Sequence, residues 1–388
     1  MTKTQLLLLS VFILLTSGRA DSSSAQVPEL VKNKQFQRHA QMAADSLYNF
    51  NDKGVEQQIA PWKNKYPNDP IWFIFNGMKL WWKMISDKYD TSHNKHFIDL
   101  MKKADYAASK VLYQHHGNAD GLVVRMAANG FLARLYSDQG EWMKSLKAAQ
   151  KAYKAYGIMK TQLPQFPDLE LTKGLKLFYS AYLPKAYPVL KAFSAFLPKG
   201  NEKEGLHYLR EASKHAIFAR AEATYFLGYI NFKYLHNFQK ATSYFSRLYH
   251  SYPRNNYYAR LLVKSEYKMG HYNNALNAIN RSLDRWNKNK LPYLKVLRES
   301  MLFWKGRIFY RNKKYKQALP LFEQSLQLSR QLPRSKHRQY YAESAYYAGV
   351  ISDQEGHKTK ARYYYKIVIH AKAAKNYQKK ARKKLNQL

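Results

Sequence analysis

The chain is 388 residues long, and 46% of its residues are hydrophobic and 15% aromatic, which is enough apolar side chain for an extended folded core. It carries 65 Lys and Arg against 26 Asp and Glu, a formal net charge of +39 that exceeds what solubility needs and indicates polyanionic surroundings. It contains no Cys, so disulfide bonds and thiol chemistry are excluded.

Residues 1–20 have the pattern of a secretory signal peptide. Lys3 supplies the positive start, the run from Leu6 to Leu15 is apolar, and Gly18-Arg19-Ala20 fits a small-x-small cleavage site. Ser23-Ser24-Ala25 offers a second cleavage site. The apolar run is shorter than the ~20 residues that a comfortable membrane span needs. We therefore expect a periplasmic or secreted bacterial protein with no transmembrane span after cleavage; the alternative is an uncut N-terminal anchor.

Residues 21–125 are expected to be helical, either as irregular elements or as degenerate repeats. Five aromatic residues at helical spacing favour a buried core over a sugar-binding platform. They are Trp72, Phe73, Phe75, Trp81 and Trp82. The spacing His93-x-x-His96, followed by His115-His116, resembles a metal-binding pattern, but only Asp99 stands nearby as a carboxylate. Exposed loop histidines are therefore expected here, and no metal site.

Residues 126–220 predict a weaker series of paired helices. A single helix pair at 126–156 is indicated by Leu132, Tyr136, Gly140, Trp142 and Ala149. The segment 171–215 contains Gly and Pro at positions that do not fit a plain repeat.

Residues 221–374 repeat one sparse pattern four times. A small residue is followed by an alanine 12 or 13 positions later, and an aromatic or aliphatic residue follows that alanine after four more. The four sets are Gly228, Ala241 and Phe245; Val263, Ala275 and Ile279; Gly306, Ala318 and Phe322; and Gly349, Ala361 and Tyr365. The spacing predicts two short helices per unit, with small residues where the helices cross most closely. Such units bury their apolar faces only by stacking on one another.

These units resemble the tetratricopeptide repeat (TPR) family, whose pattern joins a Leu-Gly pair to an Ala-x3-Phe pair and a later Pro. The stretch 221–255 matches with Leu227-Gly228, Ala241, Phe245 and Pro253. The chain also resembles secreted bacterial TPR proteins of unknown function. The resemblance implies an all-α fold, a superhelical stack of antiparallel helix pairs that serves as a binding scaffold.

In TPR superhelices the first helix of each pair lines a concave groove. Counting the small residue of each unit as position 8, positions 5, 9 and 13 project onto this face. They predict a basic groove with aromatic rims, suited to an acidic peptide, a C-terminal carboxylate or an anionic chain. The residues are Tyr225, Tyr229, Lys233, Arg260, Lys264, Lys268, Arg307, Arg311 and Tyr346. The alternative is an ordinary solvated face of a very basic chain, and the fourth unit interrupts the column with Val350 at position 9.

Residues 375–388 predict a basic C-terminal helix that caps the stack. Tyr377, Ala381 and Leu385 form its apolar stripe, and four lysines form the opposing face. These lysines, Lys379, Lys380, Lys383 and Lys384, constitute either a solvated cap or a patch that attaches to a polyanion.

Catalytic patterns are absent from the sequence. It has no glycine-rich phosphate loop, no Gly-x-Ser-x-Gly and no His-Glu-x-x-His, so neither an enzyme nor a cofactor is expected. The favoured interpretation is an exported scaffold that binds another envelope or secreted protein through the basic groove. The alternative is a module that binds lipopolysaccharide, cell-wall polymer or, less readily, nucleic acid through its charge. A third hypothesis is an accessory domain of an enzyme whose site lies in residues 26–125.

Overall fold

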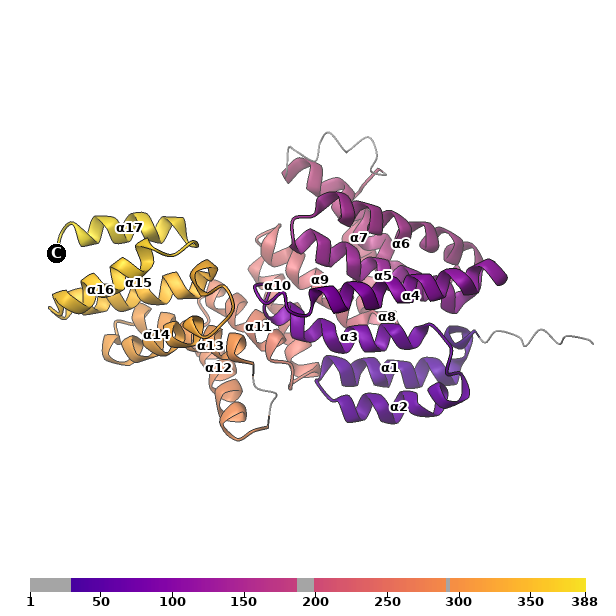
Figure 1. Cartoon of the computed structure of the whole chain (residues 1–388), viewed down its shortest axis with the longest axis horizontal. Coiled ribbons are helices and arrows are strands. Elements are labelled where there is room, and N and C mark those ends of the chain that lie inside the picture. Colours follow the sequence, from indigo (N-terminus) through magenta and orange to yellow (C-terminus); the bar gives the residue numbers. More distant parts are fainter. Residues whose placement is uncertain (1–28, 187–198, 291–293) are drawn as a thin grey trace, which may run out of the picture.

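The computed structural model describes residues 29–186, 199–290 and 294–388 (Figure 1). The predicted signal peptide and both candidate cleavage sites lie outside these ranges. The described residues form seventeen α-helices and no β-strand, which confirms the all-α fold class.

Eight successive helix pairs precede a last single helix. The helices are α1 (Lys34–Tyr48) and α2 (Asp52–Lys65), α3 (Ile71–Ser86) and α4 (Asn94–Gln114), α5 (Ala119–Asp138) and α6 (Trp142–Gln162), α7 (Leu169–Ala186) and α8 (Glu202–His215), α9 (Arg220–Lys233) and α10 (Phe238–Ser251), α11 (Asn256–Met269) and α12 (Tyr272–Asn287), α13 (Lys295–Arg311) and α14 (Tyr315–Arg330), α15 (Gln339–Gln354) and α16 (Lys358–Ile369), and α17 (Lys375–Leu385).

The helix pairs α9–α10, α13–α14 and α15–α16 cross at a glycine. A Cβ atom added to this glycine would press on an aromatic ring of the second helix, so the close approach requires the missing side chain. The shortest distances from such a Cβ are 2.4 Å from Gly228 to Phe245, 3.0 Å from Gly306 to Phe322 and 2.8 Å from Gly349 to Tyr365. All four alanines of the repeated pattern are fully buried. The crossing point expected from the sequence pattern is therefore present.

Helix pairing continues through the N-terminal half. A Cβ added to Gly174 of α7 would lie 2.8 Å from the Leu209 side chain of α8, so this pair also crosses at a glycine. The predicted aromatic cluster belongs to the core, since four of its five members are buried and Phe73 is half-buried. The four are Trp72, Phe75, Trp81 and Trp82.

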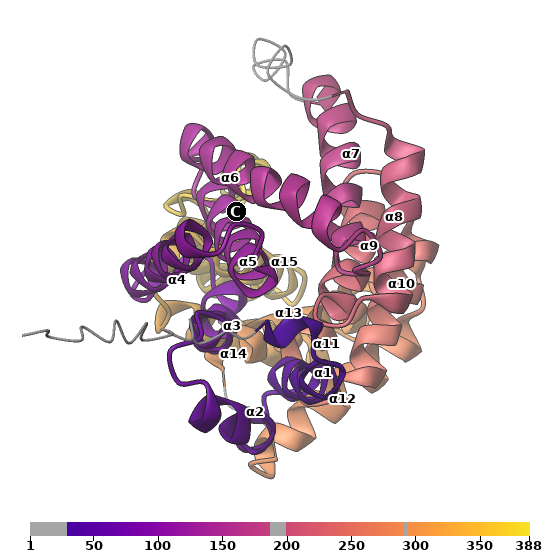
Figure 2. The ribbon, with the colours of Figure 1, turned by 90° about the vertical axis from the view of Figure 1, so that its right-hand side faces the viewer.

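The first helix closes a ring by packing beside α10 and α11 (Figure 2). Asp45 of α1 accepts a hydrogen bond from the Tyr252 hydroxyl at 2.7 Å, and Asn255 donates to the carbonyl oxygen of Tyr48 at 2.7 Å. These contacts join residues about two hundred positions apart, so the helices α1–α11 surround a central space. Helices α12–α17 extend away from this ring (Figure 1).

No helix within the described ranges is long and apolar enough to cross a membrane.

Candidate functional site

A cavity of about 1790 Å³ occupies the centre of the ring. The first helices of six successive pairs contribute to its wall, namely α1, α3, α5, α7, α9 and α11. Helix α6, the loop between α3 and α4, the start of α13 and residues near the start of α15 also contribute. A ring of helix pairs thus brings together side chains from positions 44 to 340 of the chain.

The nine residues predicted to line a groove divide into two sets. Five of them line the cavity: Tyr225, Tyr229 and Lys233 on α9, and Arg260 and Lys264 on α11. The other four lie outside it: Lys268 stands near the end of α11, and the remaining three belong to α13 and α15, which extend away from the ring. These four are Lys268, Arg307, Arg311 and Tyr346.

Each residue of the second set contacts a neighbouring aromatic ring. The partner rings are Phe238 for Lys268, Tyr347 for Arg307, Tyr272 for Arg311 and Tyr377 for Tyr346. Arg307 also lies 3.7 Å from the carboxylate of Glu343. Each of these side chains is thus engaged by a neighbour within its own part of the stack. The second set therefore does not form one site with the first.

Lys264 is the centre of a basic cluster at the α11 side of the cavity. Its pKa is lowered to about 8, first by burial and then by the positive charges of Arg260, Lys233 and Lys88. Within the described residues it has no carboxylate inside ion-pair distance, and its ammonium group lies 5.7 Å from the centre of the Phe232 ring. A half-buried ammonium group that faces three further cations is suited to an anionic ligand, which would restore its charge balance.

Among the described residues no carboxylate forms an ion pair with this cluster, although the charge of Asp138 acts on Lys88 and that of Glu343 acts on Lys264. Asp168 is occupied by backbone N–H groups of 217–219, each at 2.8 Å, and Glu222 lies 3.3 Å from the guanidinium of Arg134. Asp87 and Glu299 both face the buried guanidinium of Arg338. The wall as a whole carries nine basic and six acidic residues, so its unsatisfied charge is positive.

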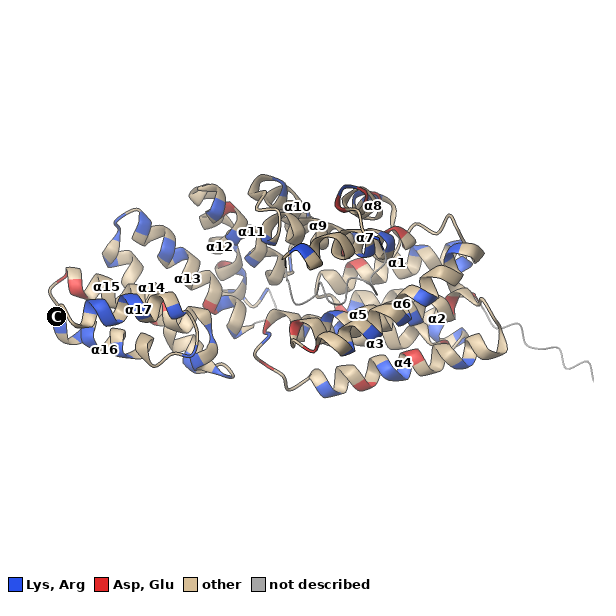
Figure 3. Ribbon diagram, turned by 90° about the horizontal axis from the view of Figure 1, so that it is seen from above, with Lys and Arg blue, Asp and Glu red and all other residues tan. Residues whose placement is uncertain are grey.

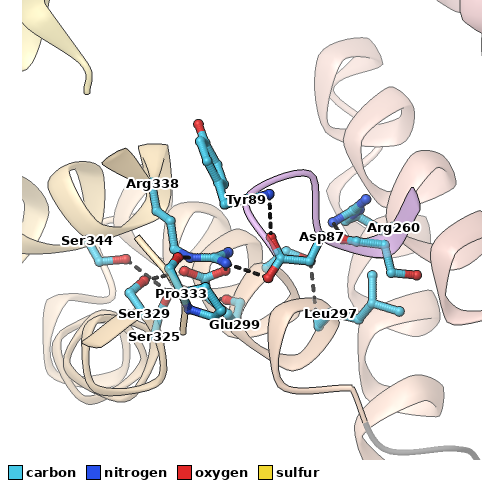
Figure 4. Close-up of polar contacts among 12 residues, drawn as sticks. Asp87, Tyr89, Arg260, Leu297, Glu299, Ser325, Ser329, Pro333, Arg338 and Ser344 are labelled. Atoms are coloured by element: carbon cyan, nitrogen blue, oxygen red, sulfur yellow. Dashed lines mark hydrogen bonds and ion pairs between the residues drawn. The ribbon is translucent and has the colours of Figure 1, made fainter. Parts of the chain in front are cut away.

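Arg338 joins the α3–α4 loop to the C-terminal repeats (Figure 4). Its guanidinium donates to Asp87, lies 3.9 Å from Glu299 and stacks 5.2 Å from the ring centre of Tyr89. Its Nε donates to the Pro333 carbonyl at 2.9 Å. This network fixes the loop that carries Lys88, and therefore shapes the basic end of the cavity.

Aromatic residues line the wall next to the basic cluster. The rings of Tyr225 and Tyr229 stack at 5.8 Å, and the Tyr225 hydroxyl lies 3.3 Å from that of Tyr257. Arg134 places its guanidinium 4.9 Å from the Trp81 ring and 4.7 Å from the Tyr225 ring. The wall therefore combines aromatic faces with positive charge.

Sequence reasoning missed Lys88 and Arg134, because their place depends on ring closure. Arg260 donates to the carbonyl oxygen of Ser86 at 3.1 Å across 174 positions of sequence, and this contact brings the α3–α4 loop to α11. No local pattern around residue 88 signals that contact.

The predicted C-terminal patch lies on α17, far from the cavity. Ala381 is fully buried, while Lys379, Lys380 and Lys383 are exposed and Lys384 lies 3.4 Å from Asp353. No group of three or more His, Asp or Glu side chains in the described part of the chain could hold a metal ion, the histidines at 93–116 included.

Comparison with known proteins supports the repeat assignment. The sequence model of the tetratricopeptide repeat family matches residues 260–333, from α11 to the turn before α15. No curated protein matches the sequence. Among solved structures, a tetratricopeptide repeat protein from Parabacteroides merdae covers 76% of this chain and 94% of its own, at 13% identity and a TM-score of 0.31. Yeast Tom70 covers 90% and 88%, at 12% identity and a TM-score of 0.30. Both superpositions are loose over the full length, so the assignment rests on the family match and on the helix-pair geometry.

Proposed function

Since residues 260–333 match the tetratricopeptide repeat family, we propose that this chain is an exported, non-catalytic scaffold that binds an acidic segment of another envelope or secreted protein in its central cavity. Tetratricopeptide repeats imply a protein-binding scaffold. Export is proposed from the signal-like residues 1–20.

The basic cluster of Lys88, Lys233, Arg260 and Lys264 is the observation that supports an acidic ligand. Arg260 and Lys264 are half-buried, which weakens solvent screening, so an anion beside them would gain more from their charges than from exposed lysines such as Lys88 and Lys233. The adjoining tyrosine wall offers apolar faces with hydroxyl edges, a surface common in protein interfaces.

A capture experiment with charge-matched variants tests the proposal. The purified protein is immobilised, incubated with envelope extract from its native cell, and washed at ~0.15 M and then ~0.5 M salt. The cavity variant carries Lys233→Glu and Lys264→Glu, and the control variant carries Lys379→Glu and Lys383→Glu on α17. We expect one defined protein partner to survive the second wash on the wild type and on the control, and to be lost on the cavity variant. Equal capture by both variants would contradict the cavity as the binding site.

A second candidate function is polyanion binding through the whole basic surface. Figure 3 shows Lys and Arg along all parts of the ribbon, and not at one end only. Such a distribution suits lipopolysaccharide, cell-wall polymer or nucleic acid, whose binding follows total charge.

Heparin, as a model polyanion, separates the two candidates. Charge-driven binding falls steeply between ~0.15 M and ~0.5 M salt, where the screening length shrinks from about 8 Å to roughly 4 Å. If the polyanion function is right, the cavity and control variants lose heparin affinity equally, and no protein partner survives the second wash.

A further inference from the structure

The cavity has an apolar cleft between α6 and α7 that no other helix within the described residues covers. The two helices follow each other in the chain, yet they diverge from the loop that joins them (Figure 2). The pairs α5–α6 and α7–α8, by contrast, pack along their lengths. Packing between consecutive pairs is therefore sparse at this step, as it also is between α2 and α3, and the gap between α6 and α7 opens into the cavity.

One wall of the cleft is an apolar stripe of α6. Trp142, Leu146, Ala149 and Tyr153 all line the cavity, at intervals of four, three and four residues. This spacing places them on one helix face, while the opposite face of α6 packs on α5. None of the four is buried, and Trp142 is 49% exposed.

The other wall is a matching stripe of α7. Leu171, Leu175, Tyr179 and Leu183 line the cavity at intervals of four residues and are only half-buried. Two apolar helix faces thus confront each other across the cleft, bridged where Lys176 of α7 reaches Tyr153 of α6. In an ordinary helix bundle the space between such faces is filled by a further helix.

The whole cavity, of which the cleft is one part, is larger than a small-ligand pocket and large enough to admit a helix. Pockets for small ligands measure roughly 300–1,000 Å³. The cavity measures about 1790 Å³. A helix of about 15 residues, with a diameter of ~10 Å and a rise of 1.5 Å per residue, fills about 1,800 Å³.

Charge restricts the chemistry of the occupant. Lys176 of α7 reaches across the cleft and donates to the Tyr153 hydroxyl at 2.6 Å, and it has no carboxylate in ion-pair contact among the described residues. The basic cluster around Lys264 lines the same cavity. A second copy of this chain, at +39, would be repelled, whereas a partner with acidic side chains would be attracted.

We propose that the α6–α7 cleft receives one amphipathic helix of a partner protein, with its apolar face on the two stripes and its acidic residues toward Lys176 and the basic cluster. This inference rests on the proposed function and narrows its ligand from an acidic segment to an acidic amphipathic helix.

Synthetic peptides of 15 residues test the inference by fluorescence anisotropy with the purified protein. The first peptide places Leu on one helix face and Glu on the other; the second has the same composition in scrambled order; the third replaces Glu by Lys. We expect the first peptide to bind and to gain helical circular dichroism, the scrambled peptide to bind at least about 10-fold more weakly, and the Lys peptide not to bind.

Protein variants locate the site. Leu146→Asp on α6 and Leu175→Asp on α7 each place a negative charge in one wall, and we expect each to weaken the first peptide by at least about 10-fold. Tyr113→Asp is the control, because Tyr113 is 83% exposed on α4 and lines no part of the cavity. Both wall positions are only half-buried, and unchanged thermal unfolding shows that each variant is folded.

The outcomes separate this inference from the proposed function. One outcome is that the first two peptides bind equally, the wall variants have no effect and Lys264→Gln abolishes binding. This outcome overturns the helical ligand but keeps the proposed function of binding an acidic segment. Failure of both acidic peptides, or equal binding of the Lys peptide, overturns both. Binding of a fluorescent long-chain fatty acid that Leu175→Asp abolishes, without peptide binding, would assign the cleft to an anionic amphiphile instead.

Discussion

Asp87 and Arg338 form a buried ion pair although 251 positions of sequence separate them. The Arg338 side chain is 3% exposed, and it also faces the buried carboxylate of Glu299 (Figure 4). One guanidinium therefore holds two carboxylates out of water and ties the α3–α4 loop to the C-terminal repeats. Burial raises the pKa of Glu299 to about 7, while Arg338 acts in the opposite direction.

Arg338→Met is expected to destabilise the protein by about 3–5 kcal/mol, because it leaves Asp87 and Glu299 buried without a counter-charge. Asp87→Asn should cost less, since Arg338 keeps Glu299 as a partner. Urea unfolding measures both changes. Lys336→Met is the matched control two residues away, because Lys336 is exposed, and its effect should stay within about 0.5 kcal/mol. If Arg338→Met behaved like the control, the ion pair would have no part in joining the loop to the repeats.

Asp69 and Asp120 give the protein a stability that falls as pH rises. Burial raises the pKa of both carboxyls, and the negative charge of Asp69 raises that of Asp120 further. The folded protein therefore keeps a proton that the unfolded chain releases, so stability is full below the ordinary carboxyl pKa and declines toward neutral and alkaline pH. Asp69→Asn replaces the shared proton by an amide donor while its oxygen still accepts from the N–H of Ile71.

We expect Asp69→Asn to flatten the pH dependence of urea unfolding between pH 5 and 8 and to stabilise the protein at pH 8, by on the order of 1 kcal/mol. Other buried carboxyls such as Glu299 contribute equally to both proteins, so the difference between the two curves isolates the pair. Asp284→Asn, at an exposed ion pair on α12, should leave the slope unchanged. A parallel pair of curves for wild type and Asp69→Asn would rule out the shared proton.

The repeats could be predicted from sequence because their signal is local. Gly228 and Phe245 belong to two consecutive helices, so their spacing alone reports the crossing. The cavity could not be predicted, because its wall depends on contacts such as Arg260 with Ser86, which no local pattern encodes. The predicted groove column assumed one regular superhelix. It divides after Lys264: Lys268 near the end of α11 already lies outside the cavity, and the later units leave the ring.

Gly228→Ala should destabilise the α9–α10 crossing by about 1–3 kcal/mol, since the added methyl would lie 2.4 Å from the Phe245 ring. Gly157→Ala on α6 is the matched helical control, because nothing lies within 4 Å of its added Cβ. Alanine is a better helix former than glycine, so the control should gain up to about 1 kcal/mol. Thermal unfolding of both variants measures the contrast, and a stabilised Gly228→Ala would mean that the crossing yields more readily than its geometry implies.

Lys264→Gln should stabilise the protein while it weakens ligand binding. The pKa of Lys264 is lowered to about 8, so its charge is disfavoured in the folded state, and this penalty is present at pH 7 and fades as pH rises from about 8 toward the ordinary lysine value. The variant should therefore unfold about 2 °C or more above the wild type at pH 7, with the difference shrinking at alkaline pH.

The same variant should bind the acidic peptides at least about 10-fold more weakly, because the ligand's negative charge loses its closest counter-charge. Lys268→Gln, one helical turn away, exposed and outside the cavity, should change neither property. A loss of stability in Lys264→Gln would mean that the wall already satisfies this ammonium group, and the cluster would then lack the unbalanced charge that favours an anionic ligand.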